Sequence, residues 1–341
     1  MKILSFAMAA ITGILVSAAQ PVLGEPIHLK HAAWESPQAF LVSEVYEPWI
    51  ADIVAASNGT LEIEIFAGGT LGGTAQQLQN IEGGVSDMGL IVPSQNPGRF
   101  ALNDIGELPF LWTDTRVSSI AINRLVENGD LNYPGFKVLA AFLTGSYQVH
   151  SSRPVRNMDD LNGLRTRVAG PVFGSVAAAL GANPVGMLAG QISETISRGG
   201  LDATMLDWTI LHAFRISEVT PYHLNYGLGG VIVLMGMNQE VYDGLPTEAK
   251  AAVDQYSGEG LARRWADAVH EETSNVIKIL SETEGHEIIE PSAEEKAEMD
   301  LALASVVEEW GGRDAEHAAV LAAFKRELEI VRAEIEANKA Q

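Results

Sequence analysis

Two arginines, one residue apart in the stretch LNGLRTRVAG (residues 161–170), are the side chains whose type and spacing point most clearly to ligand chemistry. Arginine presents a planar fork of N–H donors that holds a carboxylate through two parallel hydrogen bonds. The stretch has the pattern of a short strand, so Arg165 and Arg167 should point to the same face. The strand ends near Gly170, and ligand clefts of parallel α/β sheets lie at such strand ends. The arginines therefore indicate a carboxylate clamp, or else an ion pair with one of the 44 acidic residues.

Catalytic motifs are absent from the rest of the sequence. It has no cysteine, its eight histidines form no HExxH motif or metal-ligand cluster, and it contains no G-x-S-x-G elbow and no phosphate-binding P-loop. The glycine pairs match no dinucleotide fingerprint and are typical of turns. We therefore expect no catalytic residue, no cofactor and no metal. An enzyme in which His150 or Asp207 acts as a general base beside Arg167 stays open as the alternative class.

Charge and the N-terminal segment indicate where the protein works. The formal net charge of −22 argues against nucleic acid, because phosphates need a basic surface. Residues 1–24 have Lys2, then a mostly apolar run, then small residues before Gly24, which is typical of a secretory signal peptide. A transmembrane anchor is the alternative. An exported, cysteine-free chain of 341 residues suits the periplasm, and we expect a monomer.

The elements that must position these residues alternate between strands and helices. Alternating or buried apolar runs predict strands, and apolar residues three to four apart predict helices. Strands are expected at 26–34, 60–68, 86–93, 135–143, 182–187, 201–206 and 230–238, and helices at 40–57, 74–84, 171–181 and 190–200. This order predicts an α/β fold with parallel-rich sheets.

The C-terminal third of the chain is expected to be helical. Residues 247–284 contain no proline and keep a helical apolar spacing, so they predict one long helix, bent at Gly258 and Gly260. Residues 293–341 predict two more helices, divided at Gly311 and Gly312. Two lobes without a catalytic motif favour a binding protein that closes on a ligand.

A resemblance to a known family rests on the stretches 56–89, 107–111 (ELPFL), 153–170, 180–187, 196–208 and 241–253. In this order along the chain, they resemble the periplasmic solute-binding subunits of tripartite ATP-independent periplasmic (TRAP) transporters. The resemblance implies two α/β lobes joined by crossing strands, a long helix spanning both, and a ligand clamped between them. It also implies an organic-acid ligand and delivery to membrane permease subunits. Residues 25–144 plus about 233–270 would form lobe I, and 145–232 plus about 271–341 lobe II.

The resemblance places the family's signature arginine, which binds the ligand carboxylate, on Arg167. It leaves Arg165 as a surface residue. Members that bind sialic acid have a second arginine where this chain has Tyr147, and an acidic residue near the position of Val92. An asparagine of those members falls near Leu206. These differences argue against sialic acid and indicate a less polar pocket.

The expected pocket has aromatic walls around a single carboxylate clamp. Trp34, Met205 and Trp208 each follow or end a predicted strand, so they line the cleft or belong to the core. Arg99, after the Pro97-Gly98 turn, either faces the cleft or lies on the surface. Asp207 could assist a cation, although one carboxylate is a poor cation site. We expect an aromatic or hydrophobic monocarboxylate, with a 2-oxo acid, a hydroxy acid or a sugar acid as alternatives.

Overall fold

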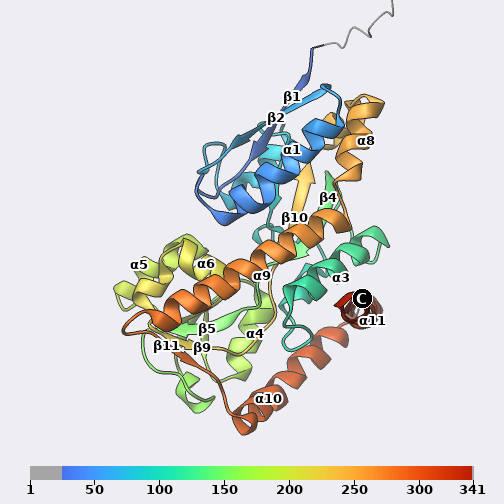
Figure 1. Cartoon of the computed structure of the whole chain (residues 1–341). Helices are drawn as coiled ribbons and strands as arrows, with labels where there is room; N and C mark the ends of the chain where they lie inside the picture. Colours follow the sequence, from blue (N-terminus) through green and yellow to red (C-terminus); the bar gives the residue numbers. More distant parts are fainter. Residues whose placement is uncertain (1–24, 340–341) are drawn as a thin grey trace, which may run out of the picture.

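The computed structural model describes residues 25–339, which form two α/β lobes, each built on its own sheet (Figure 1). The expected signal peptide, residues 1–24, lies outside the described residues. Strands β1 to β3 of the first sheet are parallel, and β10 runs antiparallel to β3 and β4. In order across this sheet, which we call the sheet of lobe I, the strands are β2 (Leu61–Phe66), β1 (Ile27–Ala32), β3 (Met88–Ile91), β10 (Ile232–Met237) and β4 (Lys137–Leu143).

The second sheet, that of lobe II, is mixed. Strand β6, which carries both arginines, is parallel to β7 and β8, whereas β5 is antiparallel to β8 and β9. The prediction of an α/β fold with parallel-rich sheets is therefore confirmed. In order across the sheet the strands are β11 (Glu287–Ile289), β9 (Tyr222–Leu224), β5 (Gln148–Ser151), β8 (Ala203–Leu206), β6 (Arg165–Val168) and β7 (Asn183–Gly186).

Short helices connect the strands of each sheet. Lobe I contains α1 (Glu47–Ala56), α2 (Gln77–Glu82), α3 (Thr115–Glu127) and α7 (Gln239–Gly244). Lobe II contains α4 (Pro171–Ala179), α5 (Ile192–Ser197) and α6 (Trp208–Ala213). The helix expected at 40–57 begins as a π-helical turn, Leu41–Tyr46, which leads directly into α1, and Pro48 lies in the first turn of α1.

Two segments cross side by side between the lobes. The link from β4 to β5 and the link from β9 to β10 are hydrogen-bonded to each other. Tyr147 N donates to Gly229 O at 2.7 Å, and Leu228 N donates to Tyr147 O at 2.9 Å. The crossing segments thus form a short paired ribbon that holds Tyr147 at the junction of the lobes.

The long helix is shorter than its sequence suggests. Residues 247–284 form two helices, α8 (Thr247–Gln255) and α9 (Glu259–Glu282), instead of one bent helix. Gly258 separates them with a φ of +63°, a conformation that glycine adopts without strain. Helix α9 nevertheless contacts α3 and β4 of lobe I as well as α6 and β11 of lobe II, and so spans both lobes (Figure 1). Trp265 of α9 stacks on Phe142 with ring centroids 4.5 Å apart.

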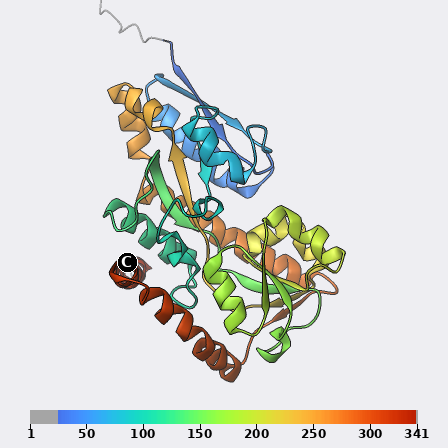
Figure 2. The same cartoon turned by 180° about the vertical axis from the view of Figure 1, so that it is seen from behind.

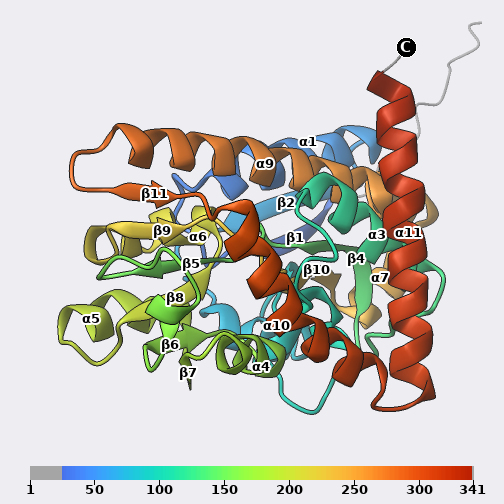
Figure 3. The same ribbon diagram turned by 90° about the horizontal axis from the view of Figure 1, so that it is seen from below.

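The packing of the C-terminal helices differs from the expected assignment of residues 271–341 to lobe II. Helices α10 (Ala293–Gly311) and α11 (Ala315–Lys339) are divided at the expected glycines, and α10 packs against α4 of lobe II. Helix α11, however, packs against α3 of lobe I, so residues 271–341 do not all belong to lobe II (Figures 2 and 3). The ion pair between Arg124 Nη2 and Glu334 Oε2, 2.7 Å long, helps to hold α11 there. Within residues 25–339, no helix has the length and apolar character needed to span a membrane.

Candidate functional site

Arg167 lies on the buried part of β6 and is only 5 % exposed. Its Nε donates to Met187 O at 2.9 Å and its Nη1 to Met205 O at 3.3 Å. Since a guanidinium carries five N–H groups, these two bonds leave donors for a ligand. No carboxylate among the described residues forms an ion pair with Arg167. A buried cation without an anionic partner is costly, and an anionic ligand would supply that partner.

Arg165 has different surroundings, although only one residue separates it from Arg167. Its side chain is 46 % exposed and pairs with Asp202, with Nη2 2.9 Å from Oδ1. The strand begins at Arg165 on the surface and continues inward, so the second arginine is buried while the first stays near solvent. Arg165 therefore already has a carboxylate partner, whereas Arg167 has none among the described residues.

Tyr147 lies against Arg167 at the crossing of the lobes. Its ring stacks on Phe173 of α4, with centroids 4.6 Å apart and planes 9° from parallel. Burial raises the pKa of the Tyr147 hydroxyl, which Arg167 partly offsets, so the phenol remains neutral. Burial likewise lowers the pKa of Arg167, and Tyr147 is the largest opposing influence. The structure thus brings these two predicted site residues together.

Asp207 follows β8 and caps α6. Its Oδ1 accepts hydrogen bonds from Thr209 N at 3.0 Å, Thr209 Oγ1 at 2.6 Å and Ile210 N at 3.1 Å. Its Oδ2 is buried and has no hydrogen-bond partner, and burial raises the pKa of the carboxyl group. In the part of the chain that the structure describes, no three His, Cys, Asp or Glu side chains are grouped to hold a metal. Asp207 is therefore a helix cap near Arg167, without the neighbours of a cation site.

Met205 and Trp208 lie in the core of lobe II and are at most 1 % exposed. The ring of Trp208 packs on His150 at a centroid distance of 4.8 Å. His150 is itself held at both nitrogens, by Leu206 O at 3.1 Å and by His223 Nδ1 at 2.9 Å. Burial lowers its pKa far below the usual value. His150 is therefore not free to act as the general base of the enzyme alternative.

Trp34 connects lobe I to lobe II. It follows β1 and stacks on Phe214, which follows α6, with centroids 6.0 Å apart and planes 22° from parallel. The Nε1 of Trp34 is buried without a hydrogen-bond partner. Val92 follows β3, at the same edge of the parallel strands as Trp34, and is half-buried. Sequence reasoning missed Phe214, because an isolated phenylalanine after a short helix carries no local signal.

Arg99 lies away from this group, which agrees with the surface alternative and not with the cleft alternative. Its guanidinium is bound to the carboxylate of Glu82, with Nη1 2.9 Å from Oε2. It lies beside Gly135, just before β4 begins. Trp34 and Val92 instead follow the C-terminal ends of their strands, and β4 runs in the same direction as β3. Arg99 is therefore at the opposite edge of the sheet.

Glu107 is a further buried side chain of the site that sequence reasoning did not single out. It ends the 3₁₀ turn η4 (Asn103–Glu107) of lobe I and is 1 % exposed. Its Oε2 accepts a hydrogen bond of 3.2 Å from Phe173 N in lobe II. The stretch ELPFL was noted for its resemblance, but nothing local showed that the carboxyl group of Glu107 packs against Gly170, three residues after Arg167.

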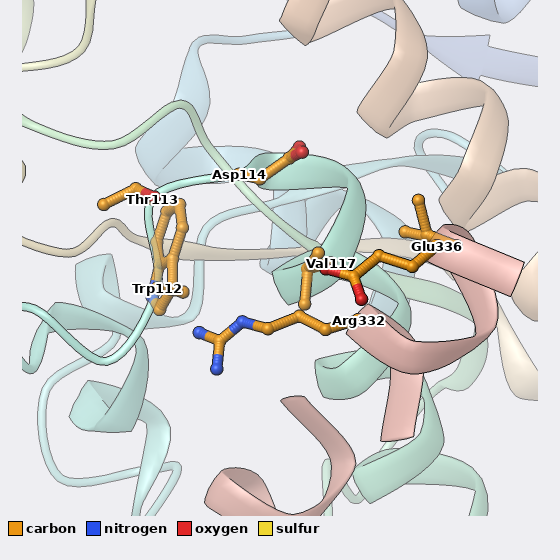
Figure 4. A pocket seen from close by; sticks show the side chains of 7 residues that line it. Trp112, Thr113, Asp114, Val117, Arg332 and Glu336 are labelled. Atoms are coloured by element: carbon orange, nitrogen blue, oxygen red, sulfur yellow. The ribbon is translucent and has the colours of Figure 1, made fainter. Parts of the chain in front are cut away.

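A separate surface cavity of about 160 Å³ lies between α11 and the loop that precedes α3 (Figure 4). Trp112, Val117 and Arg332 line it, and Arg332 Nη2 donates to Leu111 O at 2.7 Å. None of the candidate site residues lines this cavity. Its position beneath α11 separates it from the group around Arg167.

Comparison with known proteins agrees with this arrangement. Residues 32–313 match the model of the bacterial extracellular solute-binding protein family 7. The chain is 24 % identical over 328 residues to the C4-dicarboxylate-binding periplasmic protein DctP of Rhodobacter capsulatus, covering 90 % of this chain and 93 % of that protein. It is 26 % identical over 206 residues to the 2,3-diketo-L-gulonate-binding periplasmic protein YiaO of Escherichia coli, covering 58 % and 62 %.

Solved structures show the same fold. A marine metagenome TRAP solute-binding protein specific for aromatic acid ligands, in complex with 3-hydroxybenzoate, superposes with a TM-score of 0.83 at 26 % identity, covering 90 % of this chain and 99 % of that one. A TRAP solute-binding protein of Rhodoferax ferrireducens with copurified benzoate has a TM-score of 0.81 at 22 % identity, covering 91 % and 99 %. The chain therefore belongs to the bacterial extracellular solute-binding protein family 7 and is a TRAP solute-binding protein.

Proposed function

We propose that this protein is the periplasmic subunit that captures an organic-acid anion for a TRAP transporter and delivers it to the membrane permease subunits. The observation that carries the proposal is the buried guanidinium of Arg167, which has spare donors and is paired with no carboxylate of residues 25–339. An anion entering between the lobes would complete this site and favour the closed arrangement. The ligand carboxylate would be held by Arg167 beside Tyr147.

The ligand that fits best is an aromatic or hydrophobic monocarboxylate. The stacked rings of Tyr147 and Phe173 lie beside the clamp, and Trp34 and Phe214 meet between the lobes. Flat apolar surfaces of this kind suit a ring better than a chain of hydroxyl groups. The 26 % identical marine protein, which is specific for aromatic acids, supports this class. Neighbours of the same fold with bound β-D-galacturonate and D-glucuronate keep sugar acids as the alternative.

The protein acts in this proposal as a monomer in the periplasm, without turnover of its ligand. The family's members are solute-binding transport proteins, and the related proteins of Rhodobacter and Escherichia are periplasmic. A sensor that hands its ligand to a receptor would use the same site. Copurification with the two permease subunits, rather than with a receptor, would support the transport role.

A thermal-shift screen tests the proposed function and its ligand class together. The panel contains benzoate, 3-hydroxybenzoate, mandelate, pyruvate, succinate and glucuronate at equal concentrations. A ligand at 100 times its Kd should stabilise the folded state by about 2.7 kcal/mol and raise the melting temperature. We expect the largest rise with the aromatic acids. A panel-wide absence of stabilisation would refute organic-acid capture, and a rise with glucuronate alone would replace the aromatic ligand class.

A further inference from the structure

Glu107 is a carboxyl group of lobe I that reaches into lobe II. It ends η4 in lobe I, whereas the amide that its Oε2 accepts from, Phe173 N, lies in the first turn of α4. Helix α4 begins directly after Gly170, where a Cβ atom would collide with Oε1 of Glu107. The glycine therefore leaves room for this carboxyl group at the end of the segment that carries Arg167.

Burial, more than the polar groups around it, favours the protonated form of Glu107. The pKa of its carboxyl group is raised to about 8, chiefly by burial and to a smaller extent by the nearby charge of Asp104. The amides of Val172 and Phe173 and the charge of Arg167 act in the opposite direction. The negative charge of Asp104 is shared with α10, through Trp310 Nε1 at 2.9 Å and Arg313 Nη1 at 3.3 Å.

One oxygen of this buried acid has no partner. Oε2 is occupied by Phe173 N, whereas Oε1 is buried and accepts or donates no hydrogen bond within the described protein. A protonated carboxyl group carries one O–H donor, and a buried donor without an acceptor costs about 1 to 3 kcal/mol. Such an orphaned group next to an arginine without an ion pair points to an acceptor that comes from outside the chain.

We propose that Glu107 is a second ligand-contacting residue, whose Oε1 hydroxyl donates a hydrogen bond to the carboxylate bound by Arg167. This inference rests on the proposed function, because it needs a carboxylate at Arg167. Two ionised carboxylates beside one arginine would repel each other, so the incoming anion keeps Glu107 protonated. Glu107 then supplies a hydrogen bond from lobe I to a ligand whose charge is held from lobe II.

The proposal predicts that ligand binding takes up a proton. When the lobes separate, solvent reaches Glu107 and its pKa returns toward the ordinary value of about 4.3. Closure on the ligand restores the protonated acid. The apparent Kd should therefore rise with pH between about 5 and 8, by up to about tenfold per pH unit. Among the titratable groups near Glu107, Tyr147 and Arg167 keep their protons throughout this range. The charge of Asp104 also acts on Glu107, and it is paired with Arg313 of α10. Asp207, whose carboxyl pKa burial raises, lies near Arg167, so loss of proton uptake in Glu107→Gln assigns the proton to Glu107 rather than to Asp207.

The experiment is isothermal titration of the best aromatic acid from the panel at pH 6, 7 and 8, in buffers of different ionisation enthalpy. The proteins are the wild type, Glu107→Gln, which keeps a neutral donor, and Glu62→Gln, an exposed control on β2. We expect the wild type and the control to take up about one proton per ligand at pH 7. Glu107→Gln should take up none, show a Kd independent of pH, and bind at least as tightly as the wild type at pH 8.

Three outcomes would overturn the inference. They are equal proton uptake by Glu107→Gln and wild type, a wild-type Kd that does not change from pH 6 to 8, or loss of binding at every pH by a folded Glu107→Gln protein. Circular dichroism and the melting temperature establish that the variant is folded. A wild type that binds an acid through Arg167 but shows any of these outcomes refutes only the role of Glu107. A wild type that binds no acid refutes the proposed function as well.

Discussion

Replacement of Phe214 by alanine should weaken ligand binding by opening the lobes. The rings of Phe214 and Trp34 come from different lobes and stack at a centroid distance of 6.0 Å. The contact therefore exists only while the lobes are together. Phe214→Ala should raise the free energy of the closed, ligand-bound state and leave the open state unchanged.

The size of the effect follows from the geometry of the pair. A stacked aromatic pair contributes about 0.5 to 1.5 kcal/mol beyond the area that it buries. Because every 1.4 kcal/mol is a tenfold change in affinity, Kd should rise about 2- to 12-fold. The loss should appear in the dissociation rate, since the contact forms after the ligand has entered. Trp34→Phe keeps a ring in place and should change Kd by less than about threefold.

Stopped-flow fluorescence and a double-mutant cycle test this reasoning. Dissociation rates of the aromatic ligand are measured for the wild type, Phe214→Ala, Trp34→Ala and the double variant. Two rings that stabilise each other give a coupling energy of about 0.5 to 1.5 kcal/mol, so the double variant should lose little more than either single variant. Fully additive losses, or an unchanged dissociation rate in Phe214→Ala, would refute the interlobe contact.

Three further predictions concern stability, each measured by urea unfolding. Burial lowers the pKa of His31 to about 3, so only the unfolded chain gains a proton between pH 6.5 and 5. On going from pH 8 to pH 5, the free energy of unfolding of the wild type should therefore fall by about 2 kcal/mol more than that of His31→Phe. A difference between the two proteins that does not change with pH would contradict this. Arg124→Met should release α11, lowering stability by roughly 1 kcal/mol and speeding proteolysis of this helix, because Arg124 pairs with Glu334 and Glu259. Gly106→Ala should cost about 1 to 3 kcal/mol, because a Cβ there would lie 2.5 Å from Leu143 Cδ2; unchanged stability would contradict the close approach.

Local patterns in the sequence predicted much of the fold. The alternation in LEIEIF predicted a strand, and β2 is an outer strand with Glu62 and Glu64 exposed. The glycines at 311–312 marked the division between α10 and α11. The long helix was only partly correct, because helical apolar spacing continues through Gly258 although the backbone turns there. The spacing of apolar residues indicates which face of a helix is buried. It does not indicate a turn between two successive helices that both have such a face.

Contacts between distant residues could not be predicted from the sequence. Glu107 and Phe173 are 66 residues apart, and no local pattern connects a 3₁₀ turn of one lobe with a helix of the other. The position of Arg99 after a turn left open whether it faces the cleft or the surface, and nothing local showed that Glu82 would bind its guanidinium at the far edge of the sheet. The packing of α11 on α3 likewise depends on charge pairs that become visible only when the helices are placed.

The most direct test of organic-acid capture compares two arginines of the same strand. Arg167→Met and Arg165→Met remove the same charge one residue apart, and only Arg165 is already paired with a carboxylate. Calorimetric titration of the best ligand from the panel should show Arg165→Met within about threefold of the wild type, since exposed ion pairs contribute little. Arg167→Met should bind at least about 100-fold more weakly, because a charged hydrogen-bonded pair in a closed site is lost. Equal affinities of the two variants, or wild-type affinity in Arg167→Met, would contradict the assignment of Arg167 as the clamp.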